Sequence, residues 1–427
     1  MSYSQLIDFT LIAVMTLGFF AFILSEKAHV SSIPILIILG FLFGPVLGLI
    51  PNHQGHTIFN YARVLGLVLI LYTEGHNLKW KMIKKHLGTI GLLDTVGLLV
   101  TALVASFLFS YLFDLPLSAG FLFGAIISAT DPATLIPLFK QNKVDENYKT
   151  VIVTESIFND PLGIVLTILA IAMVAPQASE AQLVEKIAHF TSIYPASVIF
   201  FVYQVVSSLL IGFILGVIGY WIIRWLKPGL LPQIFGLAIA FGGFLIGEYA
   251  QTSGYLVATT IGIVFGNHAL VFKKWDEHAG FNKFIKEEMH FNEIISDLAS
   301  VFIFILLGAT TNLSIFSQSL WKGALLALGI IFIARPLATL PILALRKWSF
   351  KEYLFIALEG PRGVVPAALA GIPLSLGLMY HNTTLVDWGE VILSATIITV
   401  LISVLAETLW VKPLSKRLLG HSTKAVK

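Results

Sequence analysis

The chain has 427 residues, of which 57% are hydrophobic and only 12% charged, and its mean hydropathy is +0.87. Soluble domains carry about 25% charged residues, so this composition excludes a soluble enzyme, a nucleic-acid-binding protein and a disordered chain. The small net charge of +3 agrees with the absence of a nucleic-acid partner, and the lack of cysteine excludes a disulfide framework and a thiolate metal site. The remaining class is a polytopic, all-α membrane protein.

Apolar runs bounded by charged or turn residues predict thirteen membrane-spanning helices. The runs are too long, and alternate too little, for the strands of a transmembrane β-barrel. The first residues lack the basic region of a signal peptide, so the first run is interpreted as a retained span. In chain order the predicted spans cover 6–24, 30–50, 60–78, 88–113, 117–139, 150–175, 195–226, 231–249, 253–272, 291–311, 319–345, 352–378 and 388–411.

The distribution of lysine and arginine supports this count and gives an orientation. Of the 27 basic residues, 22 follow odd-numbered spans, 3 lie on the other side, and two, Arg335 and Arg362, fall inside spans. Cytoplasmic loops are enriched in lysine and arginine. The sequence therefore predicts an external N-terminus and a cytoplasmic C-terminus, in the cell membrane.

Two predicted spans contain breaks in corresponding places. The fifth carries Thr130-Asp131-Pro132, and the twelfth carries Glu359-Gly360-Pro361-Arg362-Gly363 followed by Pro366. Proline kinks or breaks a helix, and broken backbone persists at membrane depth only beside a cavity or inside protein. Five and twelve differ by seven, as two inverted six-helix repeats joined by one span require. Two ordinary proline kinks are the alternative interpretation.

Ionisable residues inside the predicted spans indicate a functional site, because each costs about 2.5–3.5 kcal/mol at the bilayer centre. Acids nearer the span ends are interpreted as interfacial or capping groups, and these are Glu74, Asp94, Glu248 and Glu407. The deep group consists of Asp131, Glu155, Asp160, Asp297, Arg335, Glu359 and Arg362.

Three of the deep residues are predicted to lie at one level of the membrane. Asp131, Asp160 and Arg362 each fall a few residues to the cytoplasmic side of the middle of their spans. At 1.5 Å of rise per residue, this places them within a few ångströms of one another in depth. The sequence thus predicts one shared site.

The sixth span arranges its polar residues on two ridges. Ser156 and Asp160 are four residues apart and share one ridge, and Glu155 and Asn159 share the adjacent ridge. Because an unpaired buried charge is very costly, Arg362 is predicted to be the cationic partner of Glu155. A purely structural ion-pair network is the alternative for this pair.

The chemistry of this set favours a hard cation. Its ligands are carboxylates, a hydroxyl and carbonyls freed by the broken helix, and such oxygen-rich sites suit hard cations. All eleven histidines fall in predicted loops or near span ends, which disfavours a transition metal. A buried carboxylate also binds protons more readily, so one site could exchange a cation for a proton. The sequence has no GxSxG, HExxH or Walker A motif, which argues against an enzyme, and no cofactor is expected.

Three motifs together resemble the NhaP-type sodium/proton antiporters, the electroneutral branch of the monovalent cation:proton antiporter superfamily. They are Thr130-Asp131-Pro132, Glu155-Ser156-x-x-Asn159-Asp160 and Gly360-Pro361-Arg362-Gly363, and the resemblance covers roughly residues 6–412. Asp160-Pro161 departs from the usual Asp-Gly. The resemblance implies an NhaA-like fold of thirteen spans with crossed broken helices 5 and 12, a homodimer, and elevator-type alternating access.

The resemblance also implies roles for individual residues. Asp160 would be the main carrier of cation and proton. Asp131, Ser156 and the Thr130 backbone carbonyl would complete the cation shell, with Glu74 contacting the ion through water. Glu155, Asn159 and Arg362 would form a supporting polar cluster.

The expected organisation is one transmembrane transporter unit over 1–412 and a short cytoplasmic tail over 413–427. The resemblance implies a dimerisation domain and a six-helix core at about 88–175 and 319–411. The expected activity is exchange of Na⁺, or of Li⁺ or K⁺, for H⁺, with a role in pH homeostasis. A cation channel and an ion-coupled organic anion transporter on the same fold are the alternatives, and flux saturation with strict proton coupling would distinguish them.

Overall fold

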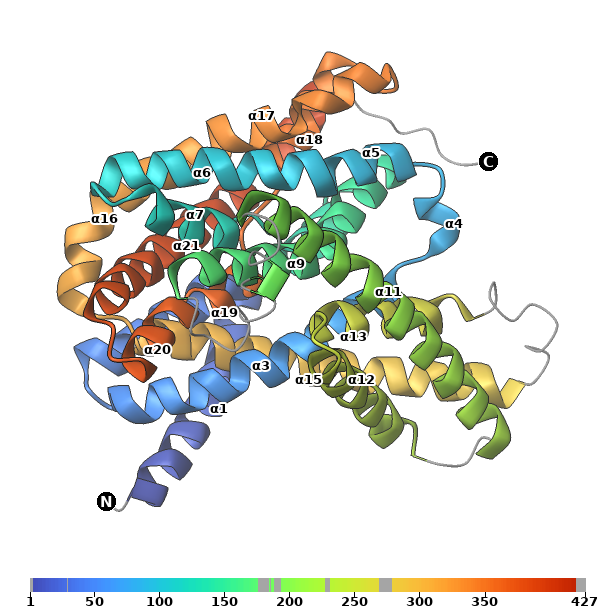
Figure 1. Ribbon diagram of the computed structural model, residues 1–427, viewed down its shortest axis with the longest axis horizontal. Helices are drawn as coiled ribbons and strands as arrows, with labels where there is room; N and C mark the ends of the chain where they lie inside the picture. The colour runs from blue at the N-terminus through green and yellow to red at the C-terminus, as the bar shows by residue number, and fades with distance from the viewer. Residues whose placement is uncertain are drawn as a thin grey trace. The chain divides into compact units, whose positions relative to one another are not determined.

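The computed structural model describes residues 3–28, 30–175, 184, 186–187, 193–226, 231–268 and 279–419, so the end of the predicted tail, 420–427, lies outside the described residues. All regular secondary structure in this part of the chain is helical (Figure 1). The chain divides into two compact units. The first unit comprises Met1–Phe59, Lys85–Gly163 and Phe302–Lys427, and the second comprises Asn60–Lys84 and Ile164–Val301.

The first unit contains both predicted helix breaks. Its N-terminal and central elements are α1 (Tyr3–Ala28), α2 (Ser32–Phe41), η1 (Leu42–Val46), the start of α3 (Asn52–Asn77), α5 (Leu87–Leu92), η2 (Leu93–Gly97), α6 (Leu98–Phe113), α7 (Leu117–Ile127), α8 (Pro132–Gln141) and most of α9 (Glu146–Val174). The end of α15 (Ala279–Ala309) is followed by α16 (Leu313–Gly329), η4 (Ile330–Ala334), α17 (Arg335–Thr339), η5 (Leu340–Leu345), α18 (Phe350–Leu358), α19 (Val364–Leu369), α20 (Ile372–Met379) and α21 (Thr383–Leu418).

Small residues let the helices of the first unit pack closely. α6 runs alongside α7 (Figure 1), and a side chain at Gly120 or Gly124 would overlap the backbone of α6 at Ser106 or Ala102. Likewise, a side chain at Gly40 or Gly44 of α2 and η1 would overlap the end of α15. Such small-residue contacts are typical of membrane helix interfaces. α21 packs against α16 and α20.

The second unit has its own core. It contains the rest of α3, α4 (Trp80–Ile83), the end of α9, α11 (Ile193–Leu226), α12 (Pro232–Tyr249), α13 (Gly254–Gly266) and the start of α15. α13 packs against both α11 and α12. The Tyr72 hydroxyl donates a hydrogen bond to Glu288 Oε1 at 2.7 Å, and both side chains are buried.

The number of spans is only partly defined by helix length. In the described part of the chain, nine helices are long and apolar enough to cross a membrane, or ten if α7 and α8 form one broken span. Three shorter apolar segments, Ser32–Val46, Gly254–Gly266 and Val364–Met379, fall within predicted spans to within one residue. The fold is therefore an all-α polytopic membrane fold, and the count of thirteen stays a prediction.

Candidate functional site

Two broken helices meet at the centre of the candidate site. α7 and α8 are bent by 43° across the break that carries Thr130 and Asp131. α18 ends at Leu358 and α19 begins at Val364, so the Gly360-Pro361-Arg362 segment between them is not helical. The Asp131 N–H donates a hydrogen bond to the Pro361 carbonyl at 2.9 Å. The two breaks predicted from the sequence are therefore joined directly.

Asp131 begins α8 as its N-cap. Its carboxylate accepts hydrogen bonds from the Ala133 N–H at 3.1 Å and from the Thr134 hydroxyl at 2.6 Å. Pro132 takes the first helical position, where its missing N–H costs nothing. The opposite break approaches so closely that a side chain at Gly363 would overlap the Asp131 carboxylate.

α9 presents a turn of polar groups to the break in α7–α8. The Thr130 N–H donates to Asn159 Oδ1 at 3.1 Å, and the Asn159 amide donates to the Thr130 hydroxyl at 2.8 Å. The Thr130 and Ser156 hydroxyls are 2.8 Å apart, and Ser156 donates to the Ile152 carbonyl at 3.0 Å. All three polar side chains are buried. Oxygen atoms from two elements are thus concentrated at one place.

Asp160 lies on the next turn of the same ridge as Ser156 and is 1% exposed. Its charge interacts with that of Arg362. α9 runs without interruption from Glu146 to Val174 although Pro161 follows Asp160 directly. The structure therefore places Asp131, Thr130 and Ser156 at the meeting point of α7–α8, α9 and the α18–α19 break in the first unit, with Asp160 one turn along α9 from Ser156.

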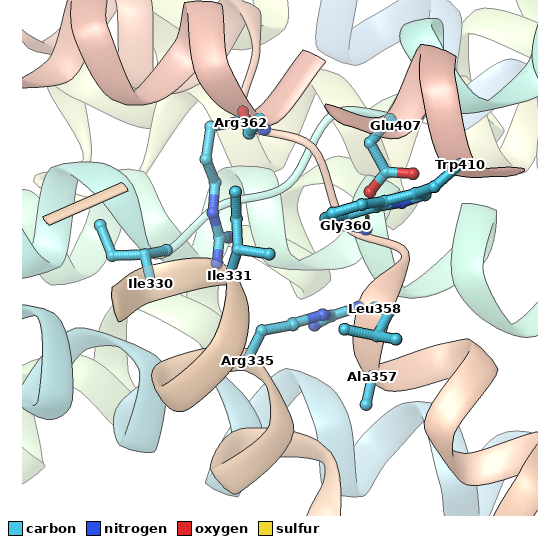
Figure 2. Close-up of a pocket in the computed structure, with 10 residues that line it drawn as sticks. Ile330, Ile331, Arg335, Ala357, Leu358, Gly360, Arg362, Glu407 and Trp410 are labelled. Atoms are coloured by element: carbon cyan, nitrogen blue, oxygen red, sulfur yellow. Dashed lines mark hydrogen bonds between the residues drawn. The ribbon is translucent and has the colours of Figure 1, made fainter. Parts of the chain in front are cut away.

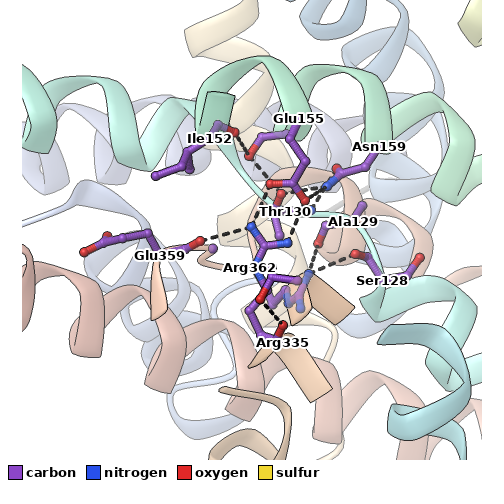
Figure 3. Close-up of polar contacts among 12 residues, drawn as sticks. Ser128, Ala129, Thr130, Ile152, Glu155, Asn159, Arg335, Glu359 and Arg362 are labelled. Carbon is purple, nitrogen blue, oxygen red and sulfur yellow. Dashed lines mark hydrogen bonds and ion pairs between the residues drawn. The ribbon is translucent and has the colours of Figure 1, made fainter. Parts of the chain in front are cut away.

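The partner predicted for Glu155 is wrong. Glu155 forms a two-pronged ion pair with Arg335, at 2.6 Å from Nη1 to Oε1 and 2.7 Å from Nη2 to Oε2 (Figure 3). Arg335 Nη2 also donates to the Glu359 carbonyl at 3.1 Å, and the Asn159 amide donates to Glu155 Oε1 at 3.1 Å. The sequence predicted two arginines inside spans, Arg335 and Arg362, and their estimated depth in the membrane could not decide which of them pairs with Glu155.

Arg362 instead holds the end of α7. Its Nη1 donates to the Ser128 and Ala129 carbonyls at 2.9 and 3.0 Å. The last carbonyls of a helix have no partner within the helix and attract a cation. Arg362 meets this need, and its own backbone N–H donates to the Ser403 hydroxyl at 3.0 Å.

The acids interpreted as interfacial or deep differ in how far the protein buries them. Asp94 and Glu407 are 5% and 2% exposed and belong to the interior of the first unit. Conversely, Asp297 is exposed on α15 of the second unit. Glu248 is exposed and accepts a hydrogen bond from the Gly254 N–H, so it acts as a capping group there. Glu74 is half-buried in α3, also in the second unit.

Sequence reasoning missed Glu407 and Ser403 of α21 as partners of the twelfth-span break. Glu407 Oε1 accepts a hydrogen bond from the Gly360 N–H at 2.6 Å. A signal existed in the sequence, because an acid and a hydroxyl four residues apart share one helix ridge of an otherwise apolar segment.

Comparison with known proteins places the chain in one family. Residues 11–417 match the family model described as sodium/hydrogen exchanger, transmembrane. The Na(+)/H(+) antiporter 1 of Methanocaldococcus jannaschii is 35% identical over 432 residues, which covers 95% of this chain and 94% of that protein. The K(+)/H(+) antiporter NhaP2 of Shewanella sp. (strain ANA-3) is 28% identical over 74% of this chain and 52% of its own length.

A solved structure agrees with this assignment. The sodium proton antiporter MjNhaP1 of Methanocaldococcus jannaschii at pH 8 superposes with a TM-score of 0.85 and 31% sequence identity, over 98% of this chain and 100% of that chain. The chain that contains these helix breaks and buried acids is therefore similar, in sequence and in fold, to a known antiporter over nearly its whole length. The chain belongs to the sodium/hydrogen exchanger family, which is a family of membrane transporters and not of enzymes.

Proposed function

We propose that this protein exchanges a monovalent cation for a proton across the cell membrane, one for one, as a secondary active antiporter. The observation that carries the proposal is the joint between the two helix breaks, where the Asp131 N–H meets the Pro361 carbonyl beside the Ser156 and Thr130 hydroxyls. Broken backbone lining a buried polar site is the arrangement expected of an alternating-access transporter.

Asp160 is proposed to carry the cation and the proton in turn. Asp131, Ser156 and the Thr130 carbonyl would complete the cation shell. Asp160 is 1% exposed and shares its ridge with Ser156, so a cation bound there would be surrounded by oxygen atoms of the protein. Glu155, Asn159 and Arg362 are proposed to hold these groups in place.

Na⁺ is the proposed physiological cation. The two relatives from Methanocaldococcus jannaschii that are 35% and 32% identical are named as Na(+)/H(+) and probable Na(+)/H(+) antiporters. K⁺ is the second candidate, because the Shewanella relatives are named K(+)/H(+) antiporters. The proposal further includes an external N-terminus, a cytoplasmic C-terminus, a homodimer, and a core at about 88–175 and 319–411 that moves as an elevator.

The decisive experiment uses Asp160→Asn in proteoliposomes loaded with a pH-sensitive dye. Wild-type protein should move protons when Na⁺, Li⁺ or K⁺ is added, with saturation, and its apparent cation affinity should weaken as the pH falls, because only the ionised carboxylate binds the cation. Asp160→Asn should abolish exchange while retaining the wild-type melting temperature. Exchange at the wild-type rate by this variant would show that Asp160 is not the carrier.

A further inference from the structure

A second pair of carboxyl groups lies in the first unit, apart from Asp160 and Asp131. Glu359 follows α18 directly, at the twelfth-span break, and Glu407 lies on α21. Their side chains are 0% and 2% exposed, and the two carboxyl groups face each other within hydrogen-bonding reach. Two ionised carboxylates cannot bond to each other, since each is only an acceptor.

The donors around this pair are distributed unequally. Glu407 accepts the Gly360 N–H at 2.6 Å, and the Trp410 indole nitrogen is turned toward it (Figure 2). In contrast, neither carboxyl oxygen of Glu359 receives a hydrogen bond from any described residue. Arg335 does not supply one, because it donates to the Glu359 backbone carbonyl while the Glu359 carboxyl points away from it (Figure 3).

An ionised Glu359 would therefore be a buried charge without a donor, which is strongly unfavourable. Its place at the C-terminal end of α18 adds to this cost, because that end of a helix carries partial negative charge. A proton on Glu359 removes the charge and creates the missing donor, directed at Glu407. Glu407 can then stay ionised, held by the Gly360 N–H.

We propose that Glu359 and Glu407 share one proton, carried on Glu359, and so form a second proton-binding site at the break between α18 and α19. The site does not depend on the proposed antiport. Glu407 also lines a small cavity of about 10 Å³, together with Arg335, Gly360, Arg362 and Trp410 (Figure 2). That volume is on the order of one water molecule.

The shared proton also balances the charges of this region. Arg335 is neutralised by Glu155, and the singly charged pair faces Arg362. A second charge, formed when the proton is lost, would compete with Glu155 for Arg335. The charged groups that face the pair are Arg335 of α17 and Arg362 of the break. Arg335 in turn interacts with Glu155 of α9 and Asp94 of η2, and Arg362 interacts with Asp160 of α9.

Infrared spectroscopy of the purified protein tests the proposal independently of transport activity. At neutral pH the wild type should show the carbonyl stretch of a protonated carboxylic acid that Glu359→Gln lacks. Glu146→Gln, which removes an exposed acid at the start of α9, should retain the wild-type band. If the wild type and Glu359→Gln have the same carbonyl region, the pair does not share a proton.

Melting at rising pH gives a second, separate measurement. A proton held in the folded state and released on unfolding makes the unfolding equilibrium constant rise about tenfold per pH unit. Glu359→Gln and Glu407→Gln each leave one ionisable carboxyl, so both should lose less stability than the wild type between neutral and alkaline pH. Glu146→Gln should follow the wild type. The same alkaline slope in all four proteins would overturn the proposal.

Discussion

Gly363 is the residue that allows the two helix breaks to approach each other. Because a side chain there would overlap the Asp131 carboxylate, Gly363→Ala should displace Asp131 from the candidate site. A displacement of about 1 Å in a positioned polar site reduces rates by about 100-fold, and we expect a loss of exchange of about 10- to 100-fold. The exchange rate of the variant is measured in proteoliposomes loaded with a pH-sensitive dye.

The control for this variant is Gly88→Ala, since nothing lies within 4 Å of the added atom there. Gly88→Ala should exchange at the wild-type rate. Equal rates for Gly363→Ala and Gly88→Ala would mean that the contact with Asp131 does not govern exchange.

For single residues, contacts between neighbours in the sequence were easier to predict than contacts between residues far apart in the sequence. The four-residue spacing of Glu155 and Asn159 predicted a shared ridge, and their side chains are hydrogen-bonded at 3.1 Å. The predicted partner of Glu155 was wrong, because Arg335 and Arg362 carry the same charge and both fall inside predicted spans. What separates them is the pair of carbonyls at the end of α7 that Arg362 binds, and this is visible only once α7 has a defined end.

The ion pair of Glu155 and Arg335 links two elements, α9 and α17. Both side chains are buried, so removing either one leaves an uncompensated charge and should cost about 3–5 kcal/mol of unfolding free energy. Removing both should cost less than the sum. Melting in detergent of Glu155→Gln, Arg335→Gln and the double variant measures the coupling energy.

Two further double-mutant cycles serve as controls for this coupling energy. Glu146 and Lys149 pair at 3.2 Å on the surface of α9, where a coupling of no more than about 0.5 kcal/mol is expected. Glu155 and Arg362 should also couple more weakly than Glu155 and Arg335, since Arg362 binds the end of α7. Additive losses for Glu155 and Arg335 would contradict the packing described here.

The positions of the helix breaks could be predicted, but the irregular helices could not. Pro132 and Pro361 lack an N–H, so each removes one hydrogen bond from the helix ladder and favours a break nearby, although α9 continues through Pro161. The π-helical segment η2 includes Asp94 and has no proline, and η4 ends two residues before Pro336, so no single residue type marks both π-helical turns in the sequence. Their geometry depends on packing against neighbouring helices. η4 directly precedes Arg335, so its turn contributes to the direction of that side chain.

For the whole molecule, composition was sufficient to predict an all-α polytopic membrane protein. The two compact units were not predictable in the same way. α3, α9 and α15 each contribute to both units, so no linker or change of composition marks the boundary. The long-range contacts that define each unit lie between residues far apart in the chain, such as Tyr72 and Glu288.

The stoichiometry of exchange also belongs to the whole molecule. Asn159-Asp160 offers one titratable carboxylate at this place in α9. Asp131 is the nearby second carboxylate. Its carboxylate accepts hydrogen bonds from Ala133 and Thr134 as the cap of α8, and we expect it to keep this role and its charge throughout the cycle.

If Asp160 alone alternates between cation and proton, each half-cycle moves the same charge, and exchange is electroneutral. The test imposes membrane potentials of either sign with valinomycin in proteoliposomes, at fixed Na⁺ and pH gradients. A potential of 100 mV is worth about 2.3 kcal/mol per net charge, so an electrogenic cycle would change its rate or its equilibrium visibly. We expect both to be independent of the potential. A shift that reverses with the sign of the potential would contradict one-for-one exchange. It would indicate that Asp131 gains and loses a proton during the cycle, or that the proton shared by Glu359 and Glu407 is transported.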